Sequence, residues 1–188
     1  MLVRTEAFRS AAAALEAGST GFIVASAGTN VNDGTGTAWT NPGNITTDDN
    51  VRANCNRTTN GNSQFLYGTF DLSTVPDGAT ITGVEVRINR GYSSTAEPQQ
   101  VRDLELSLTK DGSAVVGDNK GATSTDWPTA EASATYGASD DLWGTTLTAA
   151  EVKAATFGVM LEVDFVITGG ASTNARVDWI SINIHYEA

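Results

Sequence analysis

Residues 71–90 read DLSTVPDGATITGVEVRINR, and this stretch decides the fold. Its first half carries a turn: in the PDG of residues 76–78, the proline fixes φ and the glycine accepts a positive φ. Its second half alternates between apolar and polar side chains, with the period of a strand that has one face in a core and one in water. The apolar set is Val84, Val86 and Ile88, and the polar set is Glu85, Arg87 and Asn89. The stretch therefore predicts a turn followed by a long, half-buried strand.

Similar alternation recurs along the chain, so we expect further strands to pack with this one. The predicted strands are 21–27, 64–71, 80–90, 101–110, 114–116, 157–167 and 176–186. In 101–110 the apolar face is expected to comprise Leu104, Leu106 and Leu108. In 176–186 one face comprises Ile180, Ile182 and Ile184, and the opposite face Val177 and Trp179. Strands joined mostly by short connections predict an all-β fold, an antiparallel two-sheet β-sandwich of jelly-roll type.

One short helix is expected inside this β fold. Residues 148–155 read TAAEVKAA, and Thr148 with Glu151 three positions later forms the capping-box pattern of a helix start. The stretch before it, residues 117–143, is long and irregular. Loops of that length in compact domains tend to be functional or to pack through their own side chains.

Composition narrows the classes of function. The chain has 188 residues and a formal net charge of −11, which repels phosphate backbones, so nucleic acid is not an expected partner. Cys55 and His185 are its only cysteine and histidine, so no intrachain disulfide and no cysteine-based zinc site is expected. His185 sits within an alternating strand and is interpreted as a hydrogen-bonded strand histidine. We expect no cofactor, no metal and no membrane-spanning segment.

The N-terminal residues differ from the rest. Residues 4–17, RTEAFRSAAAALEA, are dense in strong helix formers, and Gly18 is a plausible C-cap. A narrow apolar stripe at helical spacing comprises Phe8, Ala11, Ala12 and Leu15. We therefore predict a helical or extended arm over residues 1–28 and a β-sandwich domain over 29–188. The arm is interpreted either as an ordinary terminal segment or as one that becomes ordered on a partner.

The tryptophans divide by context. Trp39 and Trp179 are expected to pack structurally, whereas Trp127 and Trp143 belong to the long irregular stretch. Tryptophans in such loops either plug the end of a sandwich or stack on sugars and anchor interfaces. Our candidate interface residues are Phe8, Leu15, Phe22, Trp127 and Trp143.

Features that would support catalysis are few. Asp140 and Asp141, with Glu131, are the only acids that suggest a glycosidase pair, and such a pair needs a defined separation across a sugar. The phosphate-binding motif GxxxxGK[ST] does not occur. We therefore predict a non-enzymatic protein.

Four segments, taken in order, resemble a β-sandwich domain of virion structural proteins from tailed bacteriophages. They are WTNPGNITTDD (39–49), FDLSTVPDGATITGVEVRI (70–88), YGASDDLWGTTLTAAEV (136–152) and VDWISINIHY (177–186). The resemblance covers residues 39–186 and leaves the N-terminal arm outside.

The resemblance implies a protein of the virion, assembled in the host cytoplasm, that decorates or cements a capsid or forms part of a tail or fibre. It implies major capsid protein or other virion proteins as partners and a homo-oligomer, with a trimer favoured. It brings no catalytic residues. The alternative from another class is a carbohydrate-binding tail or fibre module that holds a glycan on Trp127 and Trp143.

Overall fold

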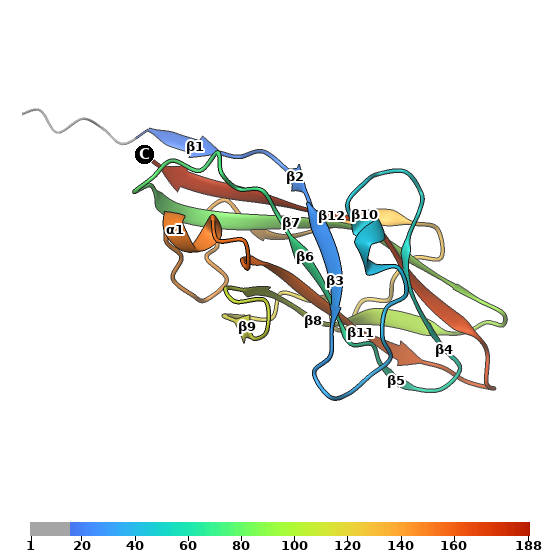
Figure 1. Cartoon of the computed structure of the whole chain (residues 1–188). Coiled ribbons are helices and arrows are strands. Elements are labelled where there is room, and N and C mark those ends of the chain that lie inside the picture. Colours follow the sequence, from blue (N-terminus) through green and yellow to red (C-terminus); the bar gives the residue numbers. More distant parts are fainter. Residues whose placement is uncertain (1–15) are drawn as a thin grey trace, which may run out of the picture.

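Two antiparallel sheets packed face to face form the body of the protein (Figure 1). The computed structural model describes residues 16–188. Sheet A contains β1 (Ala17–Ser19), β2 (Ile23–Val24), β4 (Ala53–Arg57), β7 (Thr80–Ser94), β10 (Ala132–Ala138) and β12 (Thr173–Glu187). Sheet B contains β3 (Ala27–Val31), β5 (Gly61–Asn62), β6 (Phe65–Thr69), β8 (Gln100–Thr109), β9 (Val115–Val116) and β11 (Gly158–Val166). The helical elements are the 3₁₀ turn η1 (Pro42–Ile45) and α1 (Ala149–Val152).

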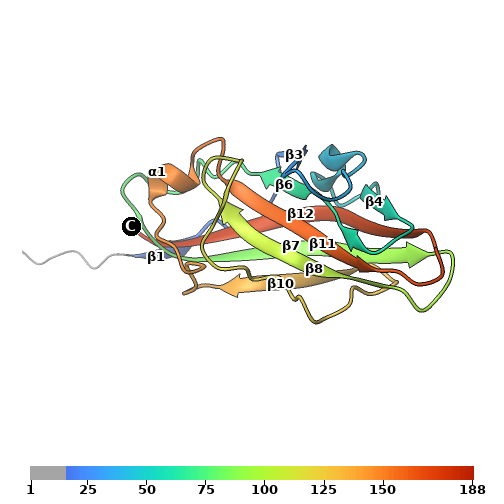
Figure 2. The same ribbon diagram turned by 90° about the horizontal axis from the view of Figure 1, so that it is seen from below.

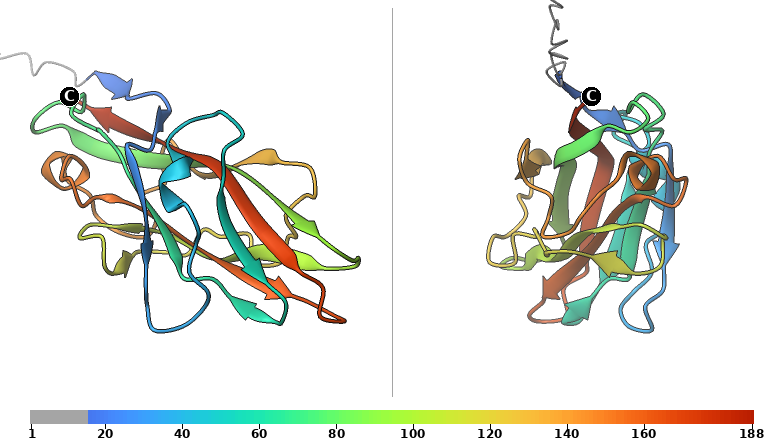
Figure 3. Two further views of the ribbon diagram at one scale, coloured as in Figure 1. Left: turned by 45° about the vertical axis from the view of Figure 1, so that its right-hand side comes forward. Right: turned by 90° about the vertical axis from the view of Figure 1, so that its left-hand side faces the viewer.

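The order of pairing is that of a jelly roll. β4, β6, β7 and β8 pair with β12, β11, β10 and β9 in turn, so later strands meet earlier ones in reverse order. This nesting places β4-β12-β7-β10 in one sheet and β6-β11-β8-β9 in the other. The predicted all-β, two-sheet, jelly-roll-like sandwich is therefore confirmed. β7 and β12 run side by side along its length (Figure 3).

The core lies between the sheets and follows the predicted alternation. Val84, Val86 and Ile88 of β7 are fully buried. Their register partners on β12 are Ile184, Ile182 and Ile180, which are fully buried too. β11 contributes Val159, Leu161, Val163 and Phe165. The predicted helix is present as α1, and both hydrogen bonds of the Thr148–Glu151 capping box form.

Two bulges shift side chains from their predicted faces. In β8 the register moves between Glu105 and Asp103, which leaves Leu104 unpaired; Leu104 is 38% exposed, and Asp103 is fully buried. In β12 Asp178 is the extra residue. Val177 there pairs with Arg90 and Trp179 with Asn89, and consecutive residues of a strand point to opposite faces. The predictions that Leu104 lies in the core and that Val177 shares a face with Trp179 are therefore wrong.

The N-terminal boundary also differs from prediction. The expected arm extended to residue 28, but β1 and β2 pair with β12 inside sheet A, and β3 begins at Ala27 in sheet B. The edge of β12 supplies hydrogen-bond partners to residues 17–24, which therefore belong to the sandwich rather than to an arm. Gly18 lies in β1 rather than at a helix end. A Cβ atom there would lie 2.8 Å from the Tyr186 ring.

Candidate functional site

Trp127 and Trp143 lie inside the protein. Trp127 is 2% exposed and Trp143 is fully buried. The Trp127 indole N–H donates to Asp103 Oδ1 at 2.7 Å, and that of Trp143 donates to the Val84 carbonyl at 2.9 Å. Both were predicted interface residues. Because neither ring reaches the surface of residues 16–188, their burial contradicts that prediction. The physical reason is that the loops carrying them fold back and satisfy both indole groups inside the sandwich.

Asp103 forms the centre of a buried polar cluster between the sheets. Its carboxylate accepts hydrogen bonds from the Trp127 indole, the Tyr136 hydroxyl (2.8 Å) and the Ala122 amide (2.8 Å). Arg90 of sheet A approaches it at 3.8 Å, measured from Nη2 to Oδ2, and is only 5% exposed. Burial, followed by the Asp103 charge, raises the pKa of Tyr136, so the phenol keeps its proton and donates.

The cluster also has an aromatic component. The Arg90 guanidinium lies 5.0 Å from the Trp127 ring centroid and 5.8 Å from that of Tyr136, within the range of cation–π attraction. Arg90 Nε and Nη1 have no hydrogen-bond partner among residues 16–188. Because three donors and a cation already engage Asp103, we interpret the cluster as a link between the two sheets rather than as a reactive centre.

Sequence reasoning missed this cluster because the β8 bulge turns Asp103 inward. The sequence 71–90 nevertheless contains one residue that indicates such a cluster. Arg90 continues the even-numbered, core-facing series of β7, and a charge at a core position needs a partner of opposite sign.

A second group, of four polar side chains and one phenylalanine, lies on the outer face of sheet A, near the point where the described chain begins. We name it the arm-base surface. It comprises Phe22, Glu85, Arg87, Asn183 and His185. The Arg87 guanidinium lies 3.6 Å from the centroid of the half-buried Phe22 ring. Since β12 lies between β2 and β7, the contact between Phe22 and Arg87 spans the outer face of β12.

A hydrogen-bonded group completes the arm-base surface. His185 Nε2 lies 2.7 Å from Glu85 Oε2, and Asn183 Nδ2 donates to the same oxygen at 3.1 Å. The hydrogen bond with His185 lowers the pKa of Glu85, and the weaker hydrogen bond from Asn183 adds to this effect. Together they outweigh burial, which alone would raise the pKa. His185 thus lies in a strand with a hydrogen-bond partner, as expected. An aromatic ring, an exposed arginine and a fixed carboxylate are the kinds of group that anchor protein contacts.

The remaining predicted interface residues divide at residue 16. Phe22 belongs to the arm-base surface, whereas Phe8 and Leu15 lie outside the described residues. The chain enters the described region by hydrogen bonds between Glu16 and Ala188, 2.9 and 3.0 Å long, and continues into β1. The C-terminus lies beside this point (Figure 1).

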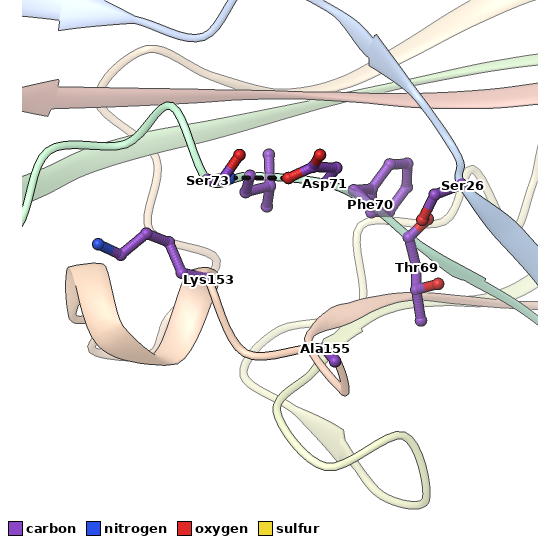
Figure 4. A pocket seen from close by; sticks show the side chains of 8 residues that line it. Ser26, Thr69, Phe70, Asp71, Ser73, Lys153 and Ala155 are labelled. Carbon is purple, nitrogen blue, oxygen red and sulfur yellow. Dashed lines mark hydrogen bonds between the residues drawn. The ribbon is translucent and has the colours of Figure 1, made fainter.

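A surface hollow of about 450 Å³ lies between the end of β6 and the segment after α1 (Figure 4). Its lining residues are Ser26, Thr69, Phe70, Asp71, Leu72, Ser73, Lys153 and Ala155. Asp71 accepts a hydrogen bond from the Ser73 amide at 3.1 Å, and hydrogen bonds from Ser73 lower the pKa of Asp71. Lys153 extends away from Phe70 and pairs with Asp77. Both charged groups of the hollow are therefore engaged locally.

The acids considered for a glycosidase pair are held apart. Glu131 and Asp140 flank the two ends of β10, a strand of seven residues. Seven residues of strand span about 23 Å, against about 5–9.5 Å for paired glycosidase carboxylates. Asp141 accepts from the Trp143 amide at 2.7 Å and pairs with Lys120 at 3.0 Å. This separation excludes Glu131 and Asp140 as such a pair.

Within residues 16–188 no three His, Cys, Asp or Glu side chains are grouped so that they could hold a metal ion. No helix in that part of the chain is long and apolar enough to cross a membrane. Comparisons of the chain with family models, curated proteins and solved structures gave no match.

Proposed function

We propose that this chain is a non-enzymatic structural protein of a tailed-bacteriophage virion, a decoration or cement protein that binds major capsid protein. The four ordered segments that resemble such proteins support the assignment. All four lie in the sandwich that the structure describes, between residues 39 and 186. The chain acts through protein contacts and is located in the assembled virion.

The observation that carries the proposal is the fixed base of the N-terminal arm. Glu16 is hydrogen-bonded to Ala188, and β1 continues this pairing along the end of β12. Glu16 is thus fixed to a rigid sheet, near the arm-base surface with its stacked Phe22 and Arg87. A short amphipathic segment attached in this way is suited to bind a groove on a neighbouring protein, and several weak contacts of an oligomer on a symmetric shell add up by avidity. The trimer implied by the resemblance is part of this proposal.

Deletion of residues 1–15 tests the arm. The deletion leaves β1 intact, so the sandwich is expected to keep its urea unfolding midpoint. Occupancy on capsids that lack the protein, measured by co-sedimentation and electron microscopy, is expected to fall at least tenfold. Unchanged occupancy would overturn the role of the arm. Absence of the full chain from purified virions would overturn the virion assignment itself.

A matched pair of double variants refines this test. Phe8→Ala with Leu15→Ala removes the apolar stripe and is expected to reduce occupancy. Thr5→Ala with Ser10→Ala changes as many residues outside the stripe and is expected to leave occupancy unchanged. Equal losses from both pairs would contradict binding through the stripe. Trp127 and Trp143 are both buried, so their rings offer no exposed surface on which a glycan could stack.

A further inference from the structure

Several strands of the two sheets have their outer edges covered by other segments of the chain. The outer edge of β12 is covered in turn by β1, β2 and β4. The outer edge of β8 pairs with β9 and then with the loop that follows: Lys120 donates to the Leu106 carbonyl at 2.9 Å, and Trp127 to that of Val101 at 2.6 Å. On β3, residues of η1 pack so closely that a Cβ atom on Gly28 would lie 2.1 Å from the Pro42 carbonyl oxygen.

β10 has no such cover among residues 16–188. It forms one margin of sheet A, with β7 as its partner, and lies at the rim of the molecule in Figure 2. Alternate residues of an edge strand direct their backbone N–H and C=O groups away from the sheet. Among residues 16–188, no group is hydrogen-bonded to that outward side of residues 132–137.

The sequence of β10 gives this edge none of the usual protection. Exposed edges are normally blocked by a charged side chain, by proline or by a bulge within the strand. β10 reads ASATYGA, which contains no charge and no proline, and its seven residues pair with β7 in unbroken register. In a chain of net charge −11, this uncharged strand is a place where a second acidic copy approaches with little local repulsion.

We propose that β10 is a homodimer contact, in which two copies pair their β10 strands antiparallel about a two-fold axis at Thr135. Thr135 is the middle residue of Ala132–Ala138, so this register gives the longest overlap. It places Ala132 opposite Ala138, Ser133 opposite Gly137 and Ala134 opposite Tyr136. No large side chain then meets another, and the two copies of sheet A become one continuous sheet.

Charged groups flank the strand at both of its ends. Asp140, beyond one end of β10, is exposed. Beyond the other end, Glu131 is paired with both Arg52 and Arg176, and the carboxyls of Asp178, Asp48 and Asp49 lie close to this group. The two-fold axis brings Asp140 of each copy towards this group of mixed charge on the other copy. The contact is independent of the virion assignment and joins copies in pairs, separately from the trimer expected from the resemblance.

Charge replacement at the axis tests the proposal. Side chains directly opposite on paired strands lie about 4.5–5.5 Å apart, so Thr135→Lys sets two lysines against each other, and Thr135→Glu two glutamates. Each variant alone is expected to weaken dimerisation at least tenfold in sedimentation equilibrium. An equimolar mixture of the two is expected to form the heterodimer. Thr123→Lys, on an exposed residue of the loop beside β8, is the matched control and is expected to dimerise as the wild type does.

Hydrogen exchange of the wild type gives a second measurement that requires no variant. Raising the protein concentration is expected to slow exchange at alternate amides of residues 132–138. A wild type that stays monomeric to millimolar concentration would overturn the proposal. So would a Thr135→Lys variant that folds with an unchanged urea midpoint and dimerises as strongly as Thr123→Lys.

Discussion

At the scale of single residues, Arg90 and Asp103 show how the jelly roll accommodates charge in its core. Each side chain comes from a different sheet, and the pair is buried. A buried ion pair adds little net stability compared with apolar residues of the same volume, but removal of one partner is costly. The two partners are also unequal here: Asp103 has three hydrogen-bond donors besides Arg90, whereas two nitrogens of Arg90 have no partner among residues 16–188.

This inequality predicts an order of stabilities. Asp103→Leu is expected to cost about 3–5 kcal/mol, because it leaves the Arg90 charge and the indole and phenol donors unpaired. Arg90→Met is expected to cost less, because three donors still engage the carboxylate. The double variant is expected to be more stable than Asp103→Leu alone by about 1 kcal/mol or more. Urea unfolding of the three variants measures these differences. Equal costs for the two single variants would contradict the arrangement of the cluster.

Asp178, the extra residue of the β12 bulge, predicts a pH effect. Burial raises the pKa of this carboxyl above its ordinary 3.8, and the nearby Asp48 charge adds to the shift. The side chain is 1% exposed, and its Oδ1 has no hydrogen-bond partner within residues 16–188. Between the unfolded and folded pKa values the native state binds more protons than the unfolded state, so stability falls as the pH rises through that interval.

Asp178→Asn removes this ionisation while keeping the size of the side chain. The variant is therefore expected to be more stable than the wild type at pH 7. The difference should shrink as the pH falls from the raised folded pKa to 3.8 and should be small below 3.8, where the wild-type carboxyl is largely protonated in both states. Urea midpoints at pH 7 and at about pH 3.5 measure both quantities. A variant that is less stable at pH 7 would show that the charged carboxylate stabilises the fold.

At the scale of elements, the sequence predicted the long strands well. The even-numbered face of β7 and the alternation of β11 follow from period 2 alone, because neither strand carries an extra residue within Val84–Ile88 or Gly158–Val166. α1 followed from its capping box, which is a local signal. These features have in common that neighbouring residues of the same segment determine them.

The features that sequence reasoning missed depend on other segments. The bulges at Leu104 and Asp178 are set by the partner strand, and a period-2 pattern contains no signal for an extra residue. β1 forms on the edge of β12, which lies more than 160 residues later in the chain. The candidate site residues were mispredicted for the same reason. Trp127 and Trp143 were read as loop residues, whereas the buried acceptors of their indole groups come from β8 and β7.

At the scale of the whole molecule, the nested strand pairs make the fold cooperative. β4 and β12, an outer pair of the nest, join residues 53–57 to residues 173–177. Opening this pair exposes core side chains of sheet A, among them Ala53, Cys55 and Val177, each fully buried. Elements that share a core in this way tend to open together rather than one at a time.

Cys55, the only cysteine, reports this opening directly. Burial raises the pKa of its thiol to about 12, so in the folded state it is both covered and protonated. A thiol reagent is therefore expected to modify Cys55 only through unfolding, and the urea dependence of the labelling rate should match the m-value of global unfolding. A Thr123→Cys variant in a Cys55→Ala background supplies the exposed control and should react without added urea. A labelling slope well below the global m-value would mean that β4 opens alone, because less surface is exposed when one edge strand leaves the sheet than when the sandwich unfolds.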